Sequence, residues 1–173
     1  MLYKNTLLLL LTASLLSCID KKKDIAVEEQ PEIIIKEDTA TSRRDSIIEF
    51  AKQYMGTPYC YAGSTPEKGF DCSGFVNFVF ANFNIELPRS SSQFKDLGTP
   101  LDPEDFKKGD VLVFYGYQDR NSIGHLGIVS EANGMDSKFI HASSGSEYAV
   151  TISELNSDHY SARFYKCINV INP

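Results

Sequence analysis

Four short runs of β-branched and aromatic residues, each bounded by turn residues, occupy the second half of the sequence. Helical spacing of apolar residues is confined to the first half, before these runs. A chain in which helices come first and strands follow favours an α+β fold with an antiparallel sheet. With 173 residues, 42% of them hydrophobic, the sequence suffices for one domain with a sizeable core. The four runs are VLVFY (111–115), HLGIVSE (125–131), KFIHAS (138–143) and RFYKCINVI (163–171).

Two segments of the first half are predicted to be helices. One begins at Ser42 with a capping-box-like pattern and ends at Gly56. The other begins at Asp71 or Cys72, in the run FDCSGFVNFVFANF. Cys72 heads a stripe on one face of this second helix, and the stripe is expected to face the core. The other residues of the stripe are Phe75, Val76, Val79, Phe80 and Phe83.

The N-terminal segment has the pattern of an export signal. The run TLLLLLTASLL has eleven residues, which is too short to span a bilayer comfortably but suits the core of a signal peptide. It ends in Leu15-Leu16-Ser17-Cys18, which resembles the lipobox of bacterial lipoproteins, in which the cysteine is lipidated. We therefore interpret residues 1–17 as a lipoprotein signal peptide and Cys18 as the lipidation site. An ordinary secretory signal that contains a cysteine is the alternative.

Residues 18–41 differ in composition from the rest of the chain. Charged residues dominate there, and the only apolar cluster is Ile33-Ile34-Ile35. Such a segment cannot bury enough apolar surface to offset the entropy lost on ordering, so it is predicted to be a flexible charged tether. The folded domain is then expected to span residues 42–173.

Charge and cysteine usage narrow the possible partners. The formal net charge is −6 and the sequence has no basic stripe, which argues against a nucleic-acid partner. The cysteines make no CxxC pair, so neither a thiol redox motif nor a metal site is indicated, and no metal or cofactor is expected. Export permits a disulfide between Cys60 and Cys167, but two separate buried thiols are favoured.

Cys72 and two histidines form a pattern typical of thiol catalysis. A thiol attacks as a thiolate, and a helix N-terminus or a nearby histidine lowers its pKa. If the predicted strands 125–131 and 138–143 fold back about the loop between them, His125 and His141 come together at the open end of the hairpin, and with an even register sum they share one face. One imidazole can then act as the base while the other orients it. The negative charge of Asp71 opposes a thiolate on the neighbouring Cys72, and the histidines would supply the cation that offsets this charge. His159 is expected to be a solvated loop residue.

Several separated segments resemble the NlpC family of bacterial cell-wall cysteine endopeptidases, in the order of that family, from about Ser42 to Asn169. The resemblance implies a papain-like α+β single domain with N-terminal helices packed on an antiparallel sheet. The segments are Tyr59, GFDCSGFV (69–76), LPRS (87–90), GDVLVF (109–114), GHLGIV (124–129) and His141.

The resemblance also implies a role for individual residues. Cys72 would be the nucleophile, His125 the general base and acid, and His141 the residue that orients His125. Tyr59 would lie near the nucleophile and help to bind the oxyanion. Asp71 and Ser73 would flank the nucleophile and line the substrate cleft, and Arg89 in the LPRS segment would support that cleft.

The implied function is hydrolysis of an amide bond in a peptide stem of peptidoglycan. The bond is expected to lie between D-glutamate and meso-diaminopimelate or between D-alanine and meso-diaminopimelate, and no cofactor is implied. The protein is expected to be a monomer that is anchored in the cell envelope through Cys18. Its expected location is the outer membrane, either on the periplasmic side or at the cell surface. An amidase or acyltransferase with the same three residues, or a non-catalytic wall-binding lipoprotein, are the alternatives.

Overall fold

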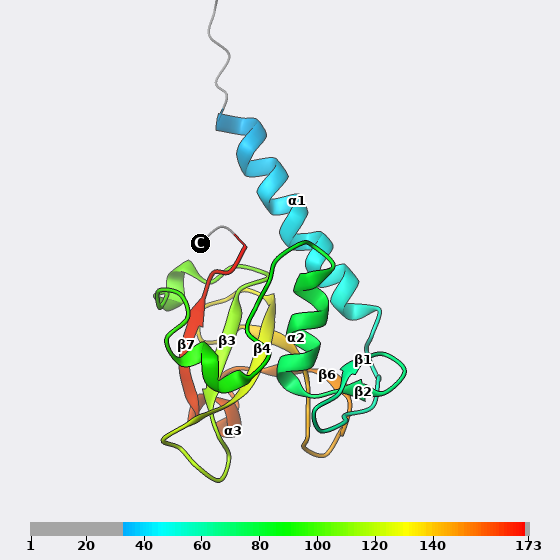
Figure 1. Ribbon diagram of the computed structural model, residues 1–173. Helices are drawn as coiled ribbons and strands as arrows, with labels where there is room; N and C mark the ends of the chain where they lie inside the picture. Colours follow the sequence, from blue (N-terminus) through cyan, green and yellow to red (C-terminus); the bar gives the residue numbers. More distant parts are fainter. Residues whose placement is uncertain (1–32, 172–173) are drawn as a thin grey trace, which may run out of the picture. The chain divides into compact units, whose positions relative to one another are not determined.

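The computed structural model describes residues 33–171, with side chains from residue 42 onward. Within that range, five strands form one antiparallel sheet in the order β6-β5-β4-β3-β7, and helices lie against it (Figure 1). The α+β class with an antiparallel sheet, predicted from the sequence, is therefore confirmed. The strands are β3 (Val111–Tyr115), β4 (Ile123–Glu131), β5 (Lys138–Ala142), β6 (Val150–Glu154) and β7 (Phe164–Ile168).

The remaining elements flank this sheet. The α-helices of the described range are α1 (Ile33–Lys52), α2 (Cys72–Ala81) and α3 (Asp158–Ser161). Two short 3-10 helices, η1 (Ser91–Lys95) and η2 (Pro103–Asp105), lie in the segments that connect α2 to β3. A small antiparallel pair, β1 (Ser64–Thr65) and β2 (Gly69–Phe70), directly precedes α2.

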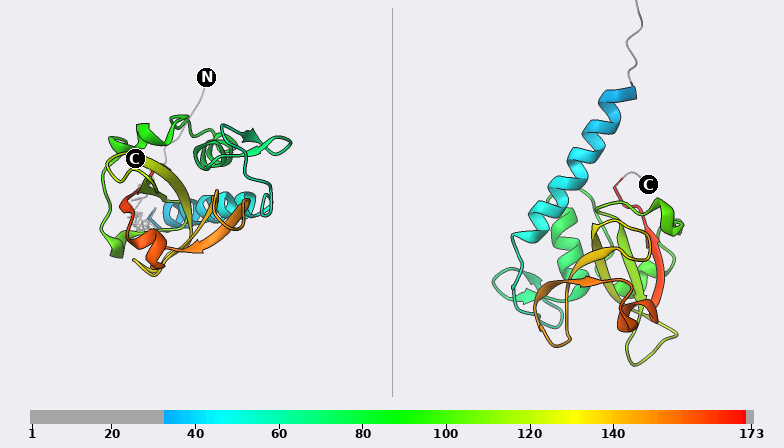
Figure 2. Two further views of the ribbon diagram at one scale, coloured as in Figure 1. Left: turned by 90° about the horizontal axis from the view of Figure 1, so that it is seen from below. Right: turned by 180° about the vertical axis from the view of Figure 1, so that it is seen from behind.

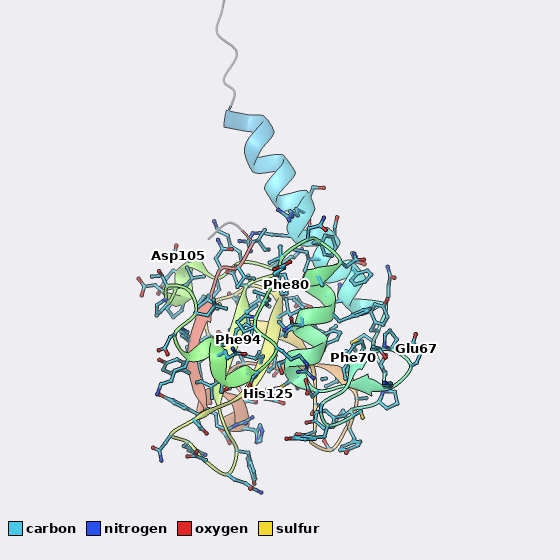
Figure 3. All side chains as sticks on the ribbon, in the orientation of Figure 1. Glu67, Phe70, Phe80, Phe94, Asp105 and His125 are labelled. Atoms are coloured by element: carbon cyan, nitrogen blue, oxygen red, sulfur yellow. The ribbon has the colours of Figure 1, made fainter. Side chains whose placement is uncertain are left out.

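The main core lies between the two longer helices and one face of the sheet (Figure 2). Its sheet side comes from alternate strand residues such as Val111, Val113 and Ile128, as the two-residue period of a strand requires. The helix side comes from α1 and from the predicted stripe of α2. In Figure 3, Phe80 of α2 and Phe94 of η1 point into this core, and both are fully buried.

A second cluster covers the opposite face of the sheet. Leu112, Phe114, Val129 and Phe139 form it, together with Cys167 of β7. Because apolar residues are buried on both faces, the central strands appear in the sequence as continuous apolar runs. This burial on both faces explains why their positions could be predicted.

Helix α1 begins at Ile33 rather than at Ser42, which corrects the expected helix start and the extent of the flexible tether. The sequence from Ile33 to Thr41 contains neither glycine nor proline, so nothing interrupts a helix that is nucleated further along. That nucleation comes from buried residues nearer its C-terminus, Ile47 and Ala51 among them. The helix ends at Lys52, and hydrogen-bonded turns continue to Gly56.

The strand ends differ slightly from the predicted ones, and several short elements were not predicted. Strand β7 ends at Ile168, although the apolar run continues, because Val170 and Ile171 leave the sheet and remain buried in the core. The unpredicted elements are the pair β1 and β2, the 3-10 helices η1 and η2, the single turn of α3, and β6, whose central residues are only half-buried.

Two expectations concern the N-terminal segment. The predicted signal peptide (1–17) and the predicted lipidation site Cys18 lie outside the described residues. Within residues 33–171, no helix is both long enough and apolar enough to cross a membrane.

Candidate active site

The first turn of α2 carries Cys72 and is capped by the residue before it. Asp71 has an extended backbone, with φ −84° and ψ 173°, and its Oδ1 accepts a hydrogen bond from the Gly74 N–H at 2.6 Å. Asp71 is therefore the N-cap of this helix. Cys72 lies where the free N–H groups and the dipole of the helix favour negative charge on its sulfur.

Glycines allow the loop that carries Tyr59 to pack against this turn. A Cβ atom at Gly74 would overlap the carbonyl oxygen of Gly63, and a Cβ atom at Gly63 would overlap that of Gly69. The same Gly63 carbonyl accepts a hydrogen bond from the Asp71 N–H at 3.0 Å. The Ser-Gly that follows Cys72 thus permits a close approach between two backbones.

Arg89 balances the charge of Asp71, so the cation beside this carboxylate is an arginine and not, as expected, a histidine. Its Nη2 lies 2.9 Å from Asp71 Oδ2 and its Nη1 lies 3.1 Å from Asp71 Oδ1, which makes the pair bidentate. Nη1 also donates to Ser73 Oγ at 3.0 Å. Asp71, Ser73 and Arg89 therefore form one hydrogen-bonded cluster beside Cys72.

His125 and His141 lie together on one face of the sheet, as predicted. Ile128 pairs with Ile140, and the same register continued by one residue would place Gly127 opposite His141, so the two histidines are diagonal neighbours on β4 and β5. His125 Nε2 lies 2.9 Å from His141 Nδ1. A Cβ atom at Gly127 would overlap the ring of Phe139 and would lie in contact with His141, so a glycine is needed at this position.

The other ring nitrogen of His141 has partners of its own. Its Nε2 lies 3.0 Å from Ser153 Oγ on β6 and 3.4 Å from Tyr160 Oη on α3. His141 is fully buried, and His125 is 9% exposed. Strand β6 and helix α3, which the sequence did not predict, therefore hold the far end of the histidine pair.

The thiol of Cys72 lies against the part of β4 that carries His125. Its Sγ donates to the Gly124 carbonyl at 4.0 Å, which is a long contact, and the Leu126 N–H points toward it. The sulfur thus contacts the backbone on both sides of His125. In Figure 3, His125 lies near the end of α2 at which the helix begins, and Phe80 lies near its other end.

Burial determines the charge of the resting site. It raises the pKa of the Cys72 thiol to about 11, and the Asp71 carboxylate adds to this rise. Burial also lowers the pKa of His125 well below its usual value, with His141 as the second cause, and lowers that of His141 to about 3. Desolvation outweighs the helix dipole here, so the thiol and both imidazoles are uncharged at neutral pH.

Tyr59 lies in the cleft beside Cys72. Burial is the main cause that raises its pKa to about 12, and the neighbouring Cys72 and Asp71 add to the rise. The phenol therefore keeps its proton at any physiological pH and can donate a hydrogen bond.

Two hollows meet at Gly124. The first, of about 440 Å³, contains Cys72 and the cluster around Asp71, and the second, of about 380 Å³, contains His125. The first is lined by Tyr59, Tyr61, Ala62, Asp71, Cys72, Ser73, Arg89, Ser90, Ser91 and Gly124. The second is lined by Tyr117, Gly124, His125, Ser143, Ser144, Gly145, His159, Tyr160 and Arg163. Because Gly124 lines both, the two hollows adjoin between Cys72 and His125, and we call them together the groove.

The second hollow contains residues that sequence reasoning missed. His159 is exposed to solvent, as expected, but it lies on α3 and not in a loop, stacks on Tyr117 and contacts Arg163. Arg163 was counted only as the first residue of a predicted strand. The one indication in the sequence that these two side chains meet was their spacing. His159 and Arg163 are four residues apart, which is the distance at which side chains become neighbours on a helix.

The remaining cysteines do not pair with each other. Cys60 and Cys167 are both free thiols; Cys167 is buried as predicted, whereas Cys60 is partly exposed. Among residues 33–171, no group of three or more histidine, cysteine, aspartate or glutamate side chains is placed to hold a metal ion.

Comparison with known proteins identifies what this fold and site resemble. The model of the NlpC/P60 family matches residues 56–169. The gamma-DL-glutamyl hydrolase of Bacillus subtilis is 39% identical over 118 residues, covering 68% of this chain and 27% of that protein. The probable endopeptidase NlpC homolog of Haemophilus influenzae is 37% identical over 114 residues, covering 65% of this chain and 55% of that protein.

A solved structure extends the likeness to the fold. An NlpC/P60 family protein from Bacillus cereus matches with a TM-score of 0.64 and 29% identity, over 74% of this chain and 40% of that one. The papain-like α+β fold implied by the sequence resemblance is confirmed by this match. The chain spans between 27% and 55% of the length of the two relatives named above.

Proposed function

The chain belongs to the NlpC/P60 family, and from that premise we propose that it is a cysteine endopeptidase that hydrolyses an amide bond in a peptide stem of peptidoglycan. One observation carries the proposal: Cys72 begins a helix and lies against the backbone of His125, whose ring is hydrogen-bonded to His141. A nucleophile, a base and a group that orients the base are the parts that thiol-based acyl transfer requires.

The hydrogen bonds support one tautomer for each histidine. His125 can accept the thiol proton only on Nδ1, because its Nε2 faces His141, and so Nε2 carries the N–H that donates to His141 Nδ1. His141 then carries its own proton on Nε2, which donates to Ser153 Oγ or Tyr160 Oη. Nδ1 is the ring nitrogen nearer to the His125 backbone, against which the sulfur lies.

The proposed reaction proceeds through a thioester. Cys72 Sγ attacks the amide carbon as its proton passes to His125, and the C–N bond breaks when His125 protonates the leaving amine. Water then attacks the thioester with His125 as base, which releases the acid and restores the thiol. Because thiol and imidazole are both neutral at rest, proton transfer accompanies the attack and does not precede it.

Two further features support this chemistry. Backbone N–H groups in the first turn of α2 and the Tyr59 phenol are positioned near the sulfur, where the oxyanion would form. Asp71, Ser73 and Arg89 line the hollow on the thiol side, where the acyl part of the substrate would lie.

The name of one relative helps to choose the bond. The Bacillus subtilis protein is called a gamma-DL-glutamyl hydrolase, which favours a bond after a γ-linked glutamate. For this chain we therefore propose the bond between D-glutamate and meso-diaminopimelate ahead of the D-alanine–diaminopimelate cross-link.

Digestion of purified muropeptides tests the proposal. The full chain would be incubated with stems of defined sequence, and the products would be identified by liquid chromatography and mass spectrometry. We expect fragments that end in D-glutamate and complementary fragments that begin with diaminopimelate. Fragments from a cut cross-link would move the proposal to the D-alanine bond, and intact stems after incubation with folded protein would reject the endopeptidase function.

We also propose that Cys18 anchors the protein to a membrane of the cell envelope. The support is the lipobox-like sequence LLSC, at the end of an apolar run of signal-peptide length. Metabolic labelling of cells with a radioactive fatty acid should label the wild-type chain but not Cys18→Ser. Equal labelling of the two chains would exclude Cys18 as the lipidation site.

A further inference from the structure

The hollow beside His125 concentrates positive charge in a protein that is acidic overall. Arg163 is only 4% exposed, yet no carboxylate of the described residues forms an ion pair with it. Its Nε donates to the His159 carbonyl at 3.0 Å and its Nη1 to the Tyr115 carbonyl at 3.4 Å. Its guanidinium also lies 5.3 Å from the centre of the Tyr160 ring, so all its partners are neutral and no carboxylate of the described residues cancels its charge.

A second cation lies beside Arg163. Arg120 donates to the Ala162 carbonyl at 3.1 Å, next to Arg163 in the chain, and its charge acts on both Arg163 and His159. His159 Nε2 lies 2.6 Å from Arg163 Nη2, and since a guanidinium can only donate, His159 accepts this bond and carries its own proton on Nδ1. The hollow is therefore rich in donors and positive charge.

Negative charge near this hollow is limited. Glu147 lines an adjoining hollow that shares His159 and Tyr160 with this one, and its carboxylate accepts from Ser146 Oγ. Asp119 precedes Arg120, but its carboxylate accepts from Ser122 Oγ and the Asn121 N–H. Neither carboxylate is within ion-pair distance of Arg163.

The position of this hollow determines which part of a substrate would enter it. In the proposed reaction, His125 gives its proton to the leaving amine, so the residue that carries that amine lies on the His125 side of the groove. The acyl part lies in the other hollow, which contains Cys72. The two hollows meet at Gly124, as the two halves of a substrate would meet at the bond being cut.

We propose that this hollow is a carboxylate-binding subsite, in which Arg163 and His159 recognise a carboxylate on the residue that carries the leaving amine. The inference rests on the proposed function, because that function places the leaving amine beside His125. A planar guanidinium with parallel N–H groups fits a carboxylate. Two carboxylates of a stem could fill the site: the side-chain carboxylate of a diamino acid such as diaminopimelate, or the α-carboxylate of a stem that ends at this residue.

A set of matched peptides tests the subsite and separates these two sources. Each peptide has the same L-alanyl-γ-D-glutamyl part. The leaving residue is diaminopimelate, diaminopimelate with a side-chain carboxamide, or lysine. Each of these three peptides is made once with a free C-terminal carboxylate and once with a C-terminal amide. We expect kcat/KM of the wild-type chain to fall about tenfold when the recognised carboxylate is neutralised, as the loss of a charged hydrogen bond implies. The position at which neutralisation has this effect identifies the source.

Two variants link this preference to the residues named. Arg163→Gln and the milder His159→Gln should bring the ratio of kcat/KM for the acid and the carboxamide peptide towards one. A merely structural role would lower both rates together and leave their ratio unchanged, which would overturn the assignment to these residues. Arg43→Gln, which alters an exposed arginine that donates to the Phe83 carbonyl at the far end of α2, should keep the wild-type ratio.

A binding measurement separates failure of the subsite from failure of the proposed function. The same peptides would be titrated into the full chain carrying Cys72→Ala and followed calorimetrically. Acid peptides that bind about tenfold more tightly than carboxamides, with the preference lost in His159→Gln, would support the subsite even if no peptide is hydrolysed. Equal binding of acid and carboxamide peptides would overturn the subsite. Hydrolysis at rates that do not depend on the carboxylate would also overturn the subsite but leave the endopeptidase proposal standing. If the peptides were neither hydrolysed nor bound, both proposals would be overturned.

Discussion

At the scale of single residues, Ser153 holds the far end of the hydrogen-bonded histidine pair that lies beside Cys72. Its Oγ lies 3.0 Å from His141 Nε2. In Ser153→Ala only the longer contact with Tyr160 would hold the His141 tautomer, so we expect kcat to fall about fivefold, the value of one neutral hydrogen bond, with KM nearly unchanged. Steady-state kinetics on a muropeptide would measure this.

Ser130 offers a matched control for that change. It is a buried serine on β4, and its Oγ has no hydrogen-bond partner among the described residues. Ser130→Ala should therefore leave kcat unchanged. Equal effects of the two substitutions, or no effect of either, would contradict the role given to Ser153.

Site residues differed in how well they could be predicted from the sequence. Cys72, His125 and His141 could be proposed because each lies in a short motif whose neighbours are glycines or buried apolar residues. Arg163 and Ser153 could not, because their place in the site depends on how β6 joins the edge of the sheet and on how α3 packs beside it. Long-range packing of this kind leaves little trace in local sequence.

At the scale of elements, an ion pair joins α1 to the start of β3. Arg44 Nη1 lies 2.8 Å from Asp110 Oδ1, and the Asp110 side chain is 1% exposed. Arg44→Met would leave this buried carboxylate without its cation, so we expect the free energy of unfolding to fall by about 3 kcal/mol. Urea unfolding of the full chain would measure the change.

The neighbouring arginine is the control for this substitution. Arg43 is exposed and donates to the Phe83 carbonyl at 2.9 Å. Arg43→Met should lower the free energy of unfolding by less than about 1 kcal/mol, as is usual for an exposed polar contact. If the loss in Arg44→Met were no larger than this, the ion pair would not be what holds α1 to the sheet.

Elements buried on both faces were the predictable ones. Strand β3 appears as an uninterrupted apolar run because Leu112 and Val113, which face opposite sides of the sheet, are both fully buried. Strand β6 has a half-buried centre and α3 is a single turn, so neither has a pattern distinct from that of a loop. The early start of α1 was missed because the sequence contains no capping pattern at Ile33. The absence of glycine and proline there permits a helix but does not indicate where it begins.

At the scale of the whole molecule, the buried histidines should make stability depend on pH. The pKa of both histidines is lowered in the folded state, so below pH 6.5 the unfolded chain binds protons that the folded chain does not. The free energy of unfolding should therefore fall as the pH falls from 6.5 towards about 3, by about 1.4 kcal/mol per pH unit for each histidine.

Urea unfolding between pH 8 and pH 5 would test this expectation above the range in which most carboxylates titrate. We expect nearly constant stability from pH 8 to pH 7 and a decline below pH 6.5. His141→Gln should about halve the slope of that decline, because one of the two groups is gone. A wild-type chain whose stability is unchanged or rises towards pH 5 would show that the histidines are not held neutral by the fold.

The central claim for the molecule is that Cys72 attacks the substrate, and a comparison of two cysteine variants tests it most directly. The full chain, Cys72→Ala and Cys167→Ala would be incubated with the same muropeptides, after circular dichroism has shown that each is folded. Cys167 is a second buried thiol, on β7 and away from the groove, so its loss makes the same chemical change outside the site. We expect Cys167→Ala to release stem fragments and Cys72→Ala to release none, whereas fragments from Cys72→Ala at the wild-type rate would contradict the claim.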